Sequence, residues 1–531
     1  MSLLRSARGM AVGTAASRAT GFLRTVSLAT VLGVQGVGAA FAVANAAPHI
    51  VYELLLGGVL TSVVVPLLVR AAKEDGDGGD AYAQRLLTVT VLVLGAAAVV
   101  LVLAAPALID LYAGELSRQS RDLAVVFARF FLPQVLLYGV GAVLGAVLNT
   151  RGHFSPPMWA PVLNNLVVVA TCGLFLLLPG TSPLSEATIT DTQVAVLGVG
   201  ATLGILAQTV ALLPALRACG FRLRLRTDVR GAGLSRIWRL GSWVLLYVVA
   251  NQLAYLVVVR LAAAENLVAD GRGYPSYVNA FILWQLPHAI VAVSVITALL
   301  PSMSRAAADE RLGDLRDELG RGLRLTVALL LPAAVGYLVL GRSLGTALFA
   351  HGEVSVEQAR YIGLLLGVFA FGLVPFSVYQ LQLRAFYALQ DTRTATMVNL
   401  GVNAALVLAD VALYVALPDR FEVAGLAAGH ALSFVVGLAV CSAVLRRRIG
   451  GGYGGPVLST AWRCGLAAAA AGVAAYAVVR PLEDRLGVGP GAAAVVLLGG
   501  GVVLLGSYVL IARVARLDEV TSLIPRRATR A

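Results

Sequence analysis

Two arginines lie inside the first apolar run of the sequence. Arg18 and Arg24 flank Gly21, and an arginine near the centre of a membrane helix costs about 2.5–3.5 kcal/mol on insertion scales. Both side chains could snorkel to an interface, but two in one span favour a water-filled cavity. Guanidinium groups pair with phosphate oxygens in bidentate fashion. The two arginines therefore predict an anionic substrate, and a pyrophosphate would suit them.

Further charged and polar side chains interrupt other apolar runs. Glu53, near the middle of the second run, could pair with either arginine. Glu53 could neutralise the charge of an arginine, or it could bind substrate or carry a proton, and both interpretations stay open. Arg129 precedes Pro133 by four residues and is a candidate lining residue of an outer cavity, and Asn164 is a polar candidate in the fifth run.

A second set of polar residues lies in the seventh and eleventh apolar runs. Arg260 lies late in the seventh run and Asp410 in the outer half of the eleventh, so we expect the two to meet at similar depth. Asn399 and Asn403 lie one helical turn apart in the eleventh run. Buried asparagines in membrane helices are more often interhelical hydrogen bonds than ligands. The glycine-rich runs at 139–145 and 198–204 are likewise expected to be close-packing helix faces.

The composition is that of a membrane protein. Of 531 residues, 59% are hydrophobic and only 13% are charged, against roughly 25% charged residues in soluble domains. The net charge of +13 comes from arginines between apolar runs, where they are topology signals rather than a nucleic-acid surface. No cluster of acids, histidines or cysteines has the spacing of a metal, cofactor or catalytic site. We therefore expect no metal, no cofactor and no enzyme.

The apolar runs predict an all-α polytopic fold with about fourteen transmembrane helices, since each crossing needs roughly 20 residues. The second, eighth and tenth runs are overlong and contain Pro48, Pro287 and Pro375, so we expect bent or broken helices there. Gly21, Pro48 and Pro287 are the candidate hinges. The fourteen runs are 9–34, 37–72, 82–112, 121–149, 156–179, 192–217, 237–264, 274–304, 322–345, 357–390, 394–417, 422–445, 458–480 and 490–515.

Positive charge sets the expected orientation. Most of the 41 Lys and Arg residues fall on one side when the N-terminus is placed inside, among them the run 446–448. The positive-inside rule then puts both termini in the cytoplasm of a bacterium, with a multi-pass protein in the inner membrane.

Short motifs recur at a nearly constant offset. Pro48-His49 returns as Pro287-His288, and Asn149-Thr150-Arg151 returns as Asp391-Thr392-Arg393. Such a repeat of six spans predicts two pseudo-symmetric six-helix lobes of like orientation, with a substrate cavity between them, as in transporters that alternate access. The predicted parts are an N-lobe at 1–217, a cytoplasmic linker at 218–236, a C-lobe at 237–448, two C-terminal helices at 449–516 and a cytoplasmic tail at 517–531.

Several motifs resemble those of one known family, the MurJ/MviN lipid II flippases. They are the runs 17–24 and 146–151 with Ala160-Pro161 and Asn164, the run 300–304, and Phe386-Tyr387-Ala388 with Asp391 and Thr394. The resemblance implies the multidrug/oligosaccharidyl-lipid/polysaccharide exporter fold and outward transport of an undecaprenyl-pyrophosphate-linked peptidoglycan precursor. It also implies that Arg18 and Arg24 are cavity arginines.

The chain departs from the better-known family members at several positions. Tyr52 stands where an arginine is expected, Ala39 replaces an acid, Ile282 replaces an arginine, and Val258 lies near an expected sodium-binding acid. These differences indicate a divergent, actinobacterial-type subfamily. The polar spacing of the eleventh span is kept, so the resemblance implies a set of candidate ion-coupling residues: Asn399, Asn403, Asp410 and Arg260.

Two alternatives and the driving force stay open. The chain could export another polyprenyl-linked glycan, or be an inactive scaffold relative that binds cell-wall synthesis and division proteins. Transport could be driven by the membrane potential or by a sodium or proton gradient. A polyprenyl-phosphate enzyme is disfavoured because no acidic or metal cluster is present. The expected partners are a polyprenyl-pyrophosphate glycolipid and membrane lipids.

Overall fold

A computed structural model of the protein describes residues 2–54, 65–180, 183–224, 226, 228, 234–264 and 271–522. Within these ranges the chain is helical and has no strand. Twelve helical segments of the described chain are long and apolar enough to cross a membrane. The all-α membrane fold is therefore confirmed, and the count of about fourteen is approximate. The first two expected spans correspond to α1, which carries the two arginines, and to α2 with α3, which are separated by residues outside the described ranges.

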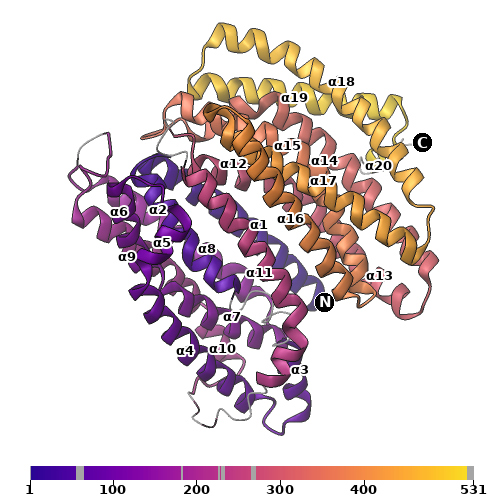
Figure 1. Ribbon diagram of the computed structural model, residues 1–531. Coiled ribbons are helices and arrows are strands. Elements are labelled where there is room, and N and C mark those ends of the chain that lie inside the picture. The colour runs from indigo at the N-terminus through magenta and orange to yellow at the C-terminus, as the bar shows by residue number, and fades with distance from the viewer. Residues whose placement is uncertain are drawn as a thin grey trace. The chain divides into compact units, whose positions relative to one another are not determined.

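Contacts divide the chain into two compact units, Met1–Pro275 and Ser276–Ala531. The expected seventh span, α11, belongs to the first unit by this criterion, whereas the lobe boundaries taken from the repeat stay a prediction. The first unit, indigo to magenta in Figure 1, contains α1 (Ser2–Leu32), α2 (Val37–Tyr52), α3 (Val65–Glu74), α4 (Asp80–Leu103), α5 (Ala105–Ala113), α6 (Arg118–Phe131), α7 (Gln134–Thr150), α8 (Ser155–Leu176), α9 (Asp191–Val210), α10 (Leu213–Ala218) and α11 (Leu234–Ala264).

The first unit is built by four main helix pairs: α1 with α8, α8 with α9, α2 with α6, and α4 with α7. Aromatic rings join α2 to α6, because Phe41 meets Phe127 and Phe131 edge-on at 5.4 and 5.1 Å between ring centroids. The start of α9 is fixed by a capping box in which Thr190 and Gln193 satisfy each other's backbone N–H groups. Helix position is thus set by both packing and caps.

Proline divides one span of the first unit into α6 and α7. The chain turns at Leu132 and Pro133, because proline cannot donate the hydrogen bond that a continuous helix requires. Beside the turn, the carbonyl of Phe130 accepts from the Thr202 hydroxyl on α9, at 2.7 Å, and Gln134 donates to the same hydroxyl at 2.9 Å. The break is therefore supported by a neighbouring helix.

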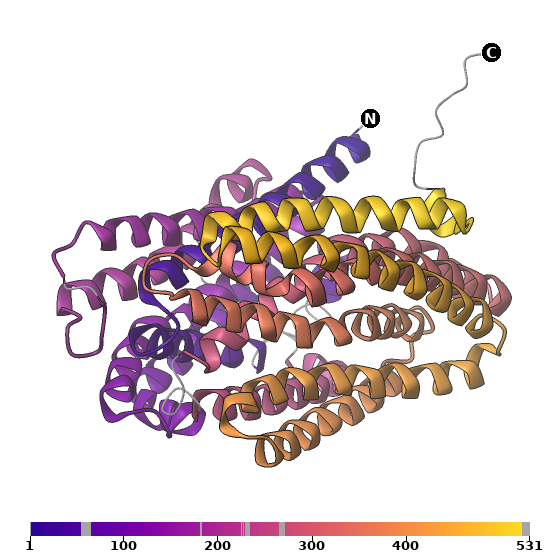
Figure 2. The same cartoon turned by 90° about the horizontal axis from the view of Figure 1, so that it is seen from above.

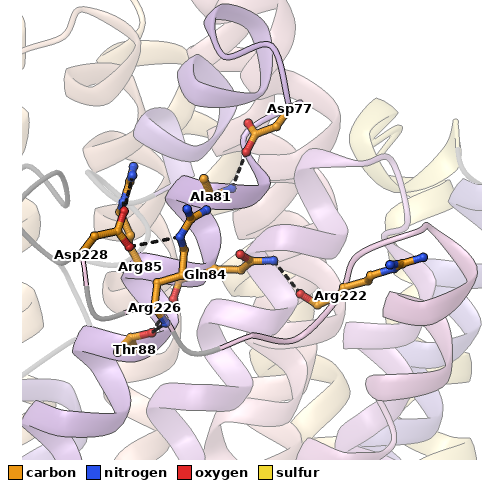
Figure 3. A network of polar contacts seen from close by, with 8 residues as sticks. All are labelled: Asp77, Ala81, Gln84, Arg85, Thr88, Arg222, Arg226 and Asp228. Atoms are coloured by element: carbon orange, nitrogen blue, oxygen red, sulfur yellow. Dashed lines mark hydrogen bonds and ion pairs between the residues drawn. The ribbon is translucent and has the colours of Figure 1, made fainter.

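The expected linker after α10 lies along α4 where it is described (Figure 3). Gln84 donates to the carbonyl of Arg222 at 2.8 Å, and the backbone N–H of Arg226 donates to the Thr88 hydroxyl at 2.8 Å. Arg85 pairs with Asp228 through two nitrogens, at 2.6 and 2.9 Å. Residues 219–224, 226 and 228 form the described start of the linker. We call them the strap, because they are bonded to α4 of the first unit.

The second unit begins within α12, which spans the boundary at Pro275. Its elements are α12 (Tyr274–Pro287), the π-helical η5 (His288–Ala292), α13 (Val293–Ala308), α14 (Leu312–Phe349), α15 (Val356–Ala388), α16 (Thr392–Ala416), the 3₁₀ turn η6 (Asp419–Phe421), α17 (Glu422–Ile449), α18 (Gly454–Leu486), α19 (Pro490–Val514) and α20 (Asp518–Thr521).

The backbones of α14 and α15 touch at glycines. An added Cβ at Gly345 would lie 2.2 Å from the carbonyl oxygen of Ala359, and one at Gly341 would lie 2.6 Å from that of Gly363. Gly341 and Gly345 are four residues apart, the spacing by which small residues let membrane helices approach closely. This contact is the tightest backbone seam of the second unit among its described residues.

The last two long helices, α18 and α19, pack side by side against α14 (Figure 1, Figure 2). The Tyr508 hydroxyl donates to the carbonyl of Ala328 at 2.6 Å, and Glu519 of α20 accepts from Thr460 at 2.8 Å. Glu519 also pairs with Arg324 of α14 at 3.4 Å. The C-terminal pair is therefore an integral part of the second unit.

The three overlong spans behave differently. The π-helical η5 directly follows Pro287 and breaks the α-helical register, as expected. A π-helical turn also occupies Glu53 and Leu54, shortly after Pro48. Pro375 lies inside α15, which runs without interruption, so the helix is not broken there and a bend at Pro375 stays a prediction. Proline in a membrane helix can be accommodated by local adjustment of the hydrogen bonds.

Candidate binding cavity

The face of α1 that meets α8 is lined by small residues. Asn165 of α8 donates to the Ser17 carbonyl at 3.2 Å and to the Thr20 hydroxyl at 3.1 Å. Gly21 faces the same side chain, since an added Cβ would lie 3.4 Å from its nitrogen. Residues 17, 20, 21 and 24 recur at three- and four-residue spacing, so they share one helix face. Arg24 continues this contact face, whereas Arg18 lies off it and is exposed.

Arg24 is partly buried and is held in an unusual position for a cation. Its Nε is buried and has no hydrogen-bond partner among the described residues. The titratable groups close to it are Tyr138 of α7 and Cys172 of α8, and neither carries a compensating negative charge at neutral pH. A buried guanidinium donor without a partner costs free energy. A hydrogen-bond acceptor bound beside Arg24 would therefore be stabilising.

Tyr138, an electrostatic neighbour of Arg24, lines a cavity of about 420 Å³, and Arg24 itself is not among the described lining residues. The walls of the cavity come from α2, α7, α8, α9 and the turn after α9, and most of the lining is apolar or glycine. The lining residues are His49, Tyr52, Leu137, Tyr138, Gly141, Ala142, Gly145, Ala146, Asn149, Pro157, Ala160, Gln208, Thr209 and Leu212. Ligand-binding cavities commonly have mostly apolar walls with a small number of polar groups.

The polar groups of the cavity are hydrogen-bonding rather than acidic. The rings of Tyr52 and Tyr138 lie 5.4 Å apart between centroids. Asn149 Oδ1 is buried and has no partner among the described residues, and the amide of Gln208 faces the same space. None of the described residues that line the cavity is acidic. The arrangement can therefore accept hydroxyl, amide or phosphate groups.

Glu53 does not pair with the arginines of α1. It caps α2 within the π-helical turn, and no nitrogen of Arg18 or Arg24 lies within 4.0 Å of its carboxylate among the described ion pairs. Its electrostatic neighbours are His49 and Tyr52. Glu53 is thus close to the cavity wall rather than to Arg24.

Arg129 and Asn164 lie away from the cavity lining. Arg129 is exposed on α6, just before the interruption at Pro133. Asn164 is buried between α8 and α9, where an added Cβ at Gly204 would lie 2.4 Å from its Oδ1. This position makes Asn164 a packing residue in the present conformation, and its substrate role stays a prediction.

Arg260 has partners within the first unit. It donates to the Leu111 carbonyl at 3.4 Å and lies 3.9 Å from the Glu115 carboxylate. The expected contact with Asp410 joins the two units and stays a prediction.

The second unit holds the remaining candidate ion-coupling residues. Asn403 donates to Asn399 at 3.0 Å, from one turn along α16. Asp410 is fully buried, and neither of its oxygens has a hydrogen-bond partner among the described residues. It packs on Gly429 of α17, where an added Cβ would lie 2.1 Å from Oδ1. Asp410 is not among the residues that line the pocket between the start of α16 and the end of α17.

The candidate hinges differ in the regularity of the helices that contain them. Gly21 is inside the uninterrupted α1 and faces Asn165, so it serves close packing here. Pro48 lies inside α2 and Pro287 ends α12 next to η5. Their movement stays a prediction.

Sequence reasoning missed most of the cavity wall. The glycine run at 198–204 packs closely against neighbouring side chains, as expected, but Gly141 and Gly145 of the other run line the cavity. Tyr138 and Gln208 were not singled out, because an isolated phenol or amide in an apolar run is common. The available signal was the co-occurrence of small and polar residues on one face of 138–149.

Comparison with known proteins gives a consistent result. A sequence model of the family described as "Lipid II flippase MurJ" matches residues 28–485, so Arg18 and Arg24 precede the matched region. The chain is 26% identical over 487 residues to the probable lipid II flippase MurJ of Rhizobium meliloti, covering 90% of this chain and 87% of the relative. It is 27% identical over 446 residues to the lipid II flippase MurJ of Burkholderia cenocepacia, covering 83% and 82%.

Solved structures show the same fold. A lipid II flippase MurJ in an inward closed conformation superimposes with a TM-score of 0.76 at 17% identity, covering 96% of this chain and 99% of that one. An inward-facing MATE family multidrug transporter of the MOP superfamily gives a TM-score of 0.59 at 16% identity, covering 84% and 93%.

Proposed function

The chain belongs to the lipid II flippase MurJ family, and from that membership we propose that it moves lipid II, the undecaprenyl-pyrophosphate-linked peptidoglycan precursor, across the membrane by alternating access. It is a multi-pass membrane transporter and not an enzyme. The relatives from Rhizobium meliloti and Burkholderia cenocepacia align with more than four fifths of the chain.

The observation that carries a substrate role for the cavity is the unsatisfied donor of Arg24. A guanidinium whose Nε has no partner among the described residues, in apolar surroundings, favours an anionic ligand. The diphosphate of lipid II has the required charge and bidentate geometry. Arg24 would hold a phosphate oxygen, while Arg18, exposed on the same helix, would attract the head group electrostatically.

The cavity beside Tyr138 suits the neutral part of the head group. Sugar hydroxyls and peptide amides pair with phenols and carboxamides, and Tyr52, Tyr138, Asn149 and Gln208 supply these groups. Its described lining residues include no acid, so they add no repulsion to an anionic substrate. In this assignment, Tyr52 contributes hydrogen bonding at a position where other family members are expected to have an arginine.

The expected orientation gives the direction and a source of energy. With both termini in the cytoplasm, moving one negative charge fully outward gains about 2.3 kcal/mol per 100 mV of potential, negative inside. The membrane potential therefore supports export of an anionic lipid, and a sodium or proton gradient is the alternative driver. Contacts with cell-wall synthesis and division proteins stay a prediction.

The test is complementation of a bacterial strain depleted of its own lipid II flippase. We expect the wild-type chain to restore growth and Arg24→Ala to abolish it at equal membrane abundance. Arg118→Ala is the matched control, because Arg118 is an exposed arginine at the start of α6, away from the cavity. Full complementation by Arg24→Ala would remove the argument for a phosphate role. Failure of the wild-type chain, when correctly inserted, would instead favour a different polyprenyl-linked glycan.

A further inference from the structure

Five polar side chains that line the cavity of the first unit make no side-chain hydrogen bond within the described part of the chain. They are His49, Tyr52, Tyr138, Asn149 and Gln208. The oxygen of the Asn149 amide is also buried. A polar group that is withdrawn from water and left unpaired costs free energy. Five unpaired groups around one space therefore indicate a ligand that completes their hydrogen bonds.

Two other amides of the first unit are satisfied by the protein itself. Gln134 donates to the Thr202 hydroxyl at 2.9 Å, and Asn165 donates to the Ser17 carbonyl at 3.2 Å. Both amides are buried and join neighbouring helices, which is the usual role of such groups in membrane proteins. The amides of Asn149 and Gln208 differ from them because they line a space.

The sequence repeat shows the same difference at Asn149. Its counterpart in the second unit, Asp391, accepts from the backbone N–H and the hydroxyl of Thr394 at 3.0 and 2.7 Å, and from Arg448 at 2.7 Å. Asp391 therefore has a structural role as the cap of α16. Asn149 occupies the same place in the motif, but its amide has no comparable bond among the described residues.

The charge of the cavity lining distinguishes between possible ligands. The described lining residues include one basic side chain, His49, and no arginine, lysine, aspartate or glutamate. A phosphate or a peptide carboxylate needs a cationic partner when it leaves water, so neither matches this lining. Sugar hydroxyl and acetamido groups are neutral, and they donate and accept as phenols and carboxamides do. The chemistry of the lining matches a sugar.

The place of the cavity favours the part of the substrate that is joined to the diphosphate. Tyr138 and Asn149 lie on one face of α7 with Gly141 and Gly145, about 16 Å apart along the helix axis at 1.5 Å per residue. Arg24, which would hold the phosphate, is an electrostatic neighbour of Tyr138. In lipid II the sugars are joined directly to the diphosphate, and the peptide branches from a sugar. A diphosphate at Arg24 therefore places a sugar next to Tyr138.

We propose that the cavity of the first unit is a carbohydrate subsite, which binds the sugars of lipid II and leaves the peptide outside. Asn149 and Gln208 bond to the hydroxyl and acetamido groups. The rings of Tyr52 and Tyr138, 5.4 Å apart between centroids, pack on the C–H face of a sugar. Asn149 and Gln208 are thus specificity-determining residues, which distinguish a polyprenyl diphosphate that carries sugars from one that does not. The inference rests on the proposed transport of lipid II.

The test measures binding to the purified full-length protein by native mass spectrometry. The added lipids are lipid II, lipid II without its peptide, and undecaprenyl diphosphate. We expect the wild type to bind the first two equally, and undecaprenyl diphosphate about tenfold more weakly because the sugar hydrogen bonds are missing. Asn149→Leu and Gln208→Leu remove the polar atoms, so each should weaken lipid II binding about tenfold. Their binding of undecaprenyl diphosphate should stay at the wild-type value, which also shows that they are folded.

Gln119→Leu is the matched control. Gln119 is an exposed amide at the start of α6 and does not line the cavity, so this variant should bind all three lipids as the wild type does. An equal loss of lipid II binding in Gln119→Leu, or wild-type binding by both cavity variants, would overturn the subsite and leave the transport of lipid II in place.

The three lipids also decide the point on the wild type alone, whether or not a variant folds. Loss of binding when only the peptide is removed would overturn the subsite, because recognition would then lie in the peptide. Equal binding of lipid II and undecaprenyl diphosphate would overturn it as well. A correctly folded wild type that binds neither of these two lipids would contradict the proposed function itself.

Discussion

Arg24 in the first unit and Asp410 in the second are both ionisable side chains in apolar helices, and both have buried polar atoms without partners among the described residues. Their surroundings differ. Arg24 is an electrostatic neighbour of Tyr138, which lines a cavity with phenol and amide groups, whereas Asp410 is sealed against Gly429. An unsatisfied group beside a cavity indicates a ligand, while one sealed by close packing indicates a structural role in this conformation.

The same contrast holds at the repeated arginines. Arg151 pairs with Asp80 and donates to the Cys219 carbonyl of the strap, while Arg393 lines a pocket between the start of α16 and the end of α17. Equivalent positions of the repeated motif therefore have different surroundings. Four predictions test how the surroundings of a side chain set its role, and the first compares a closely packed position with an open one.

The largest expected effect on stability comes from a substitution at Gly429, which packs against Asp410. Gly429→Leu places side-chain atoms where Oδ1 of Asp410 lies, and overpacking of this kind costs about 3 kcal/mol or more. We expect a clearly lower thermal unfolding temperature in detergent. Gly401→Leu on α16 is the control, because an added Cβ there meets no atom within 4 Å. Equal stability of the two variants would show that the α16–α17 contact is loose.

Arg24→Lys distinguishes a phosphate-binding guanidinium from a charge of any geometry. Lysine keeps the positive charge but loses the planar fork of donors, so we expect lipid II flipping in proteoliposomes to fall about tenfold with unchanged protein stability. An unchanged flipping rate would mean that charge alone matters at this position. Arg118→Lys should leave the rate at the wild-type value.

Asp410→Asn tests whether Asp410 has a packing role or takes part in a functional ion pair. The amide has nearly the same shape, so the packing on Gly429 is kept, and we expect complementation close to wild type. The pairing with Arg260 expected from the sequence requires the opposite: loss of function in Asp410→Asn and recovery in a double variant with Arg260→Gln. Growth of the single and double variants, at matched abundance, decides between the two.

The smallest effect concerns the strap. The hydrogen bonds from Arg85 hold the pKa of Asp228 below its ordinary value, although burial opposes this shift. A lowered carboxyl pKa favours the folded protein at pH values above the ordinary value of about 3.9, and this contribution is lost as the pH falls through the lowered value. Wild type should therefore unfold at a slightly higher temperature than Asp228→Asn at pH 7. The difference should close near pH 3, and a constant difference would contradict the ion-pair explanation.

Local sequence features predicted the helices well because length and hydropathy determine whether a segment can cross a membrane. Arg24 was found for the same reason, since a charge in an apolar run is conspicuous. The cavity was not found, because its wall combines Tyr52, Tyr138 and Gln208 from helices far apart in the chain. Their proximity depends on how α2, α7 and α9 pack, which periodicity does not specify.

Depth along a span does not by itself specify contacts. Within the first unit Arg260 contacts Leu111 and Glu115, from the segment that includes α5, and its pairing with Asp410 stays a prediction. Two residues at equal depth meet only when their helices are neighbours and face each other. Proline showed a similar limit: the break after Pro287 was predicted correctly, while α15 passes through Pro375 intact.

The π-helical turn at His288–Ala292 affects how the whole segment Tyr274–Ala308 must be studied. A π turn contains one residue more than an α turn, and one residue corresponds to about 100° of rotation. Cysteine-accessibility scanning through this segment should therefore show a regular oscillation up to Pro287 and a phase jump of about 100° beyond Ala292. A single helical wheel drawn over all of it would assign lipid-facing and protein-facing residues incorrectly in one half.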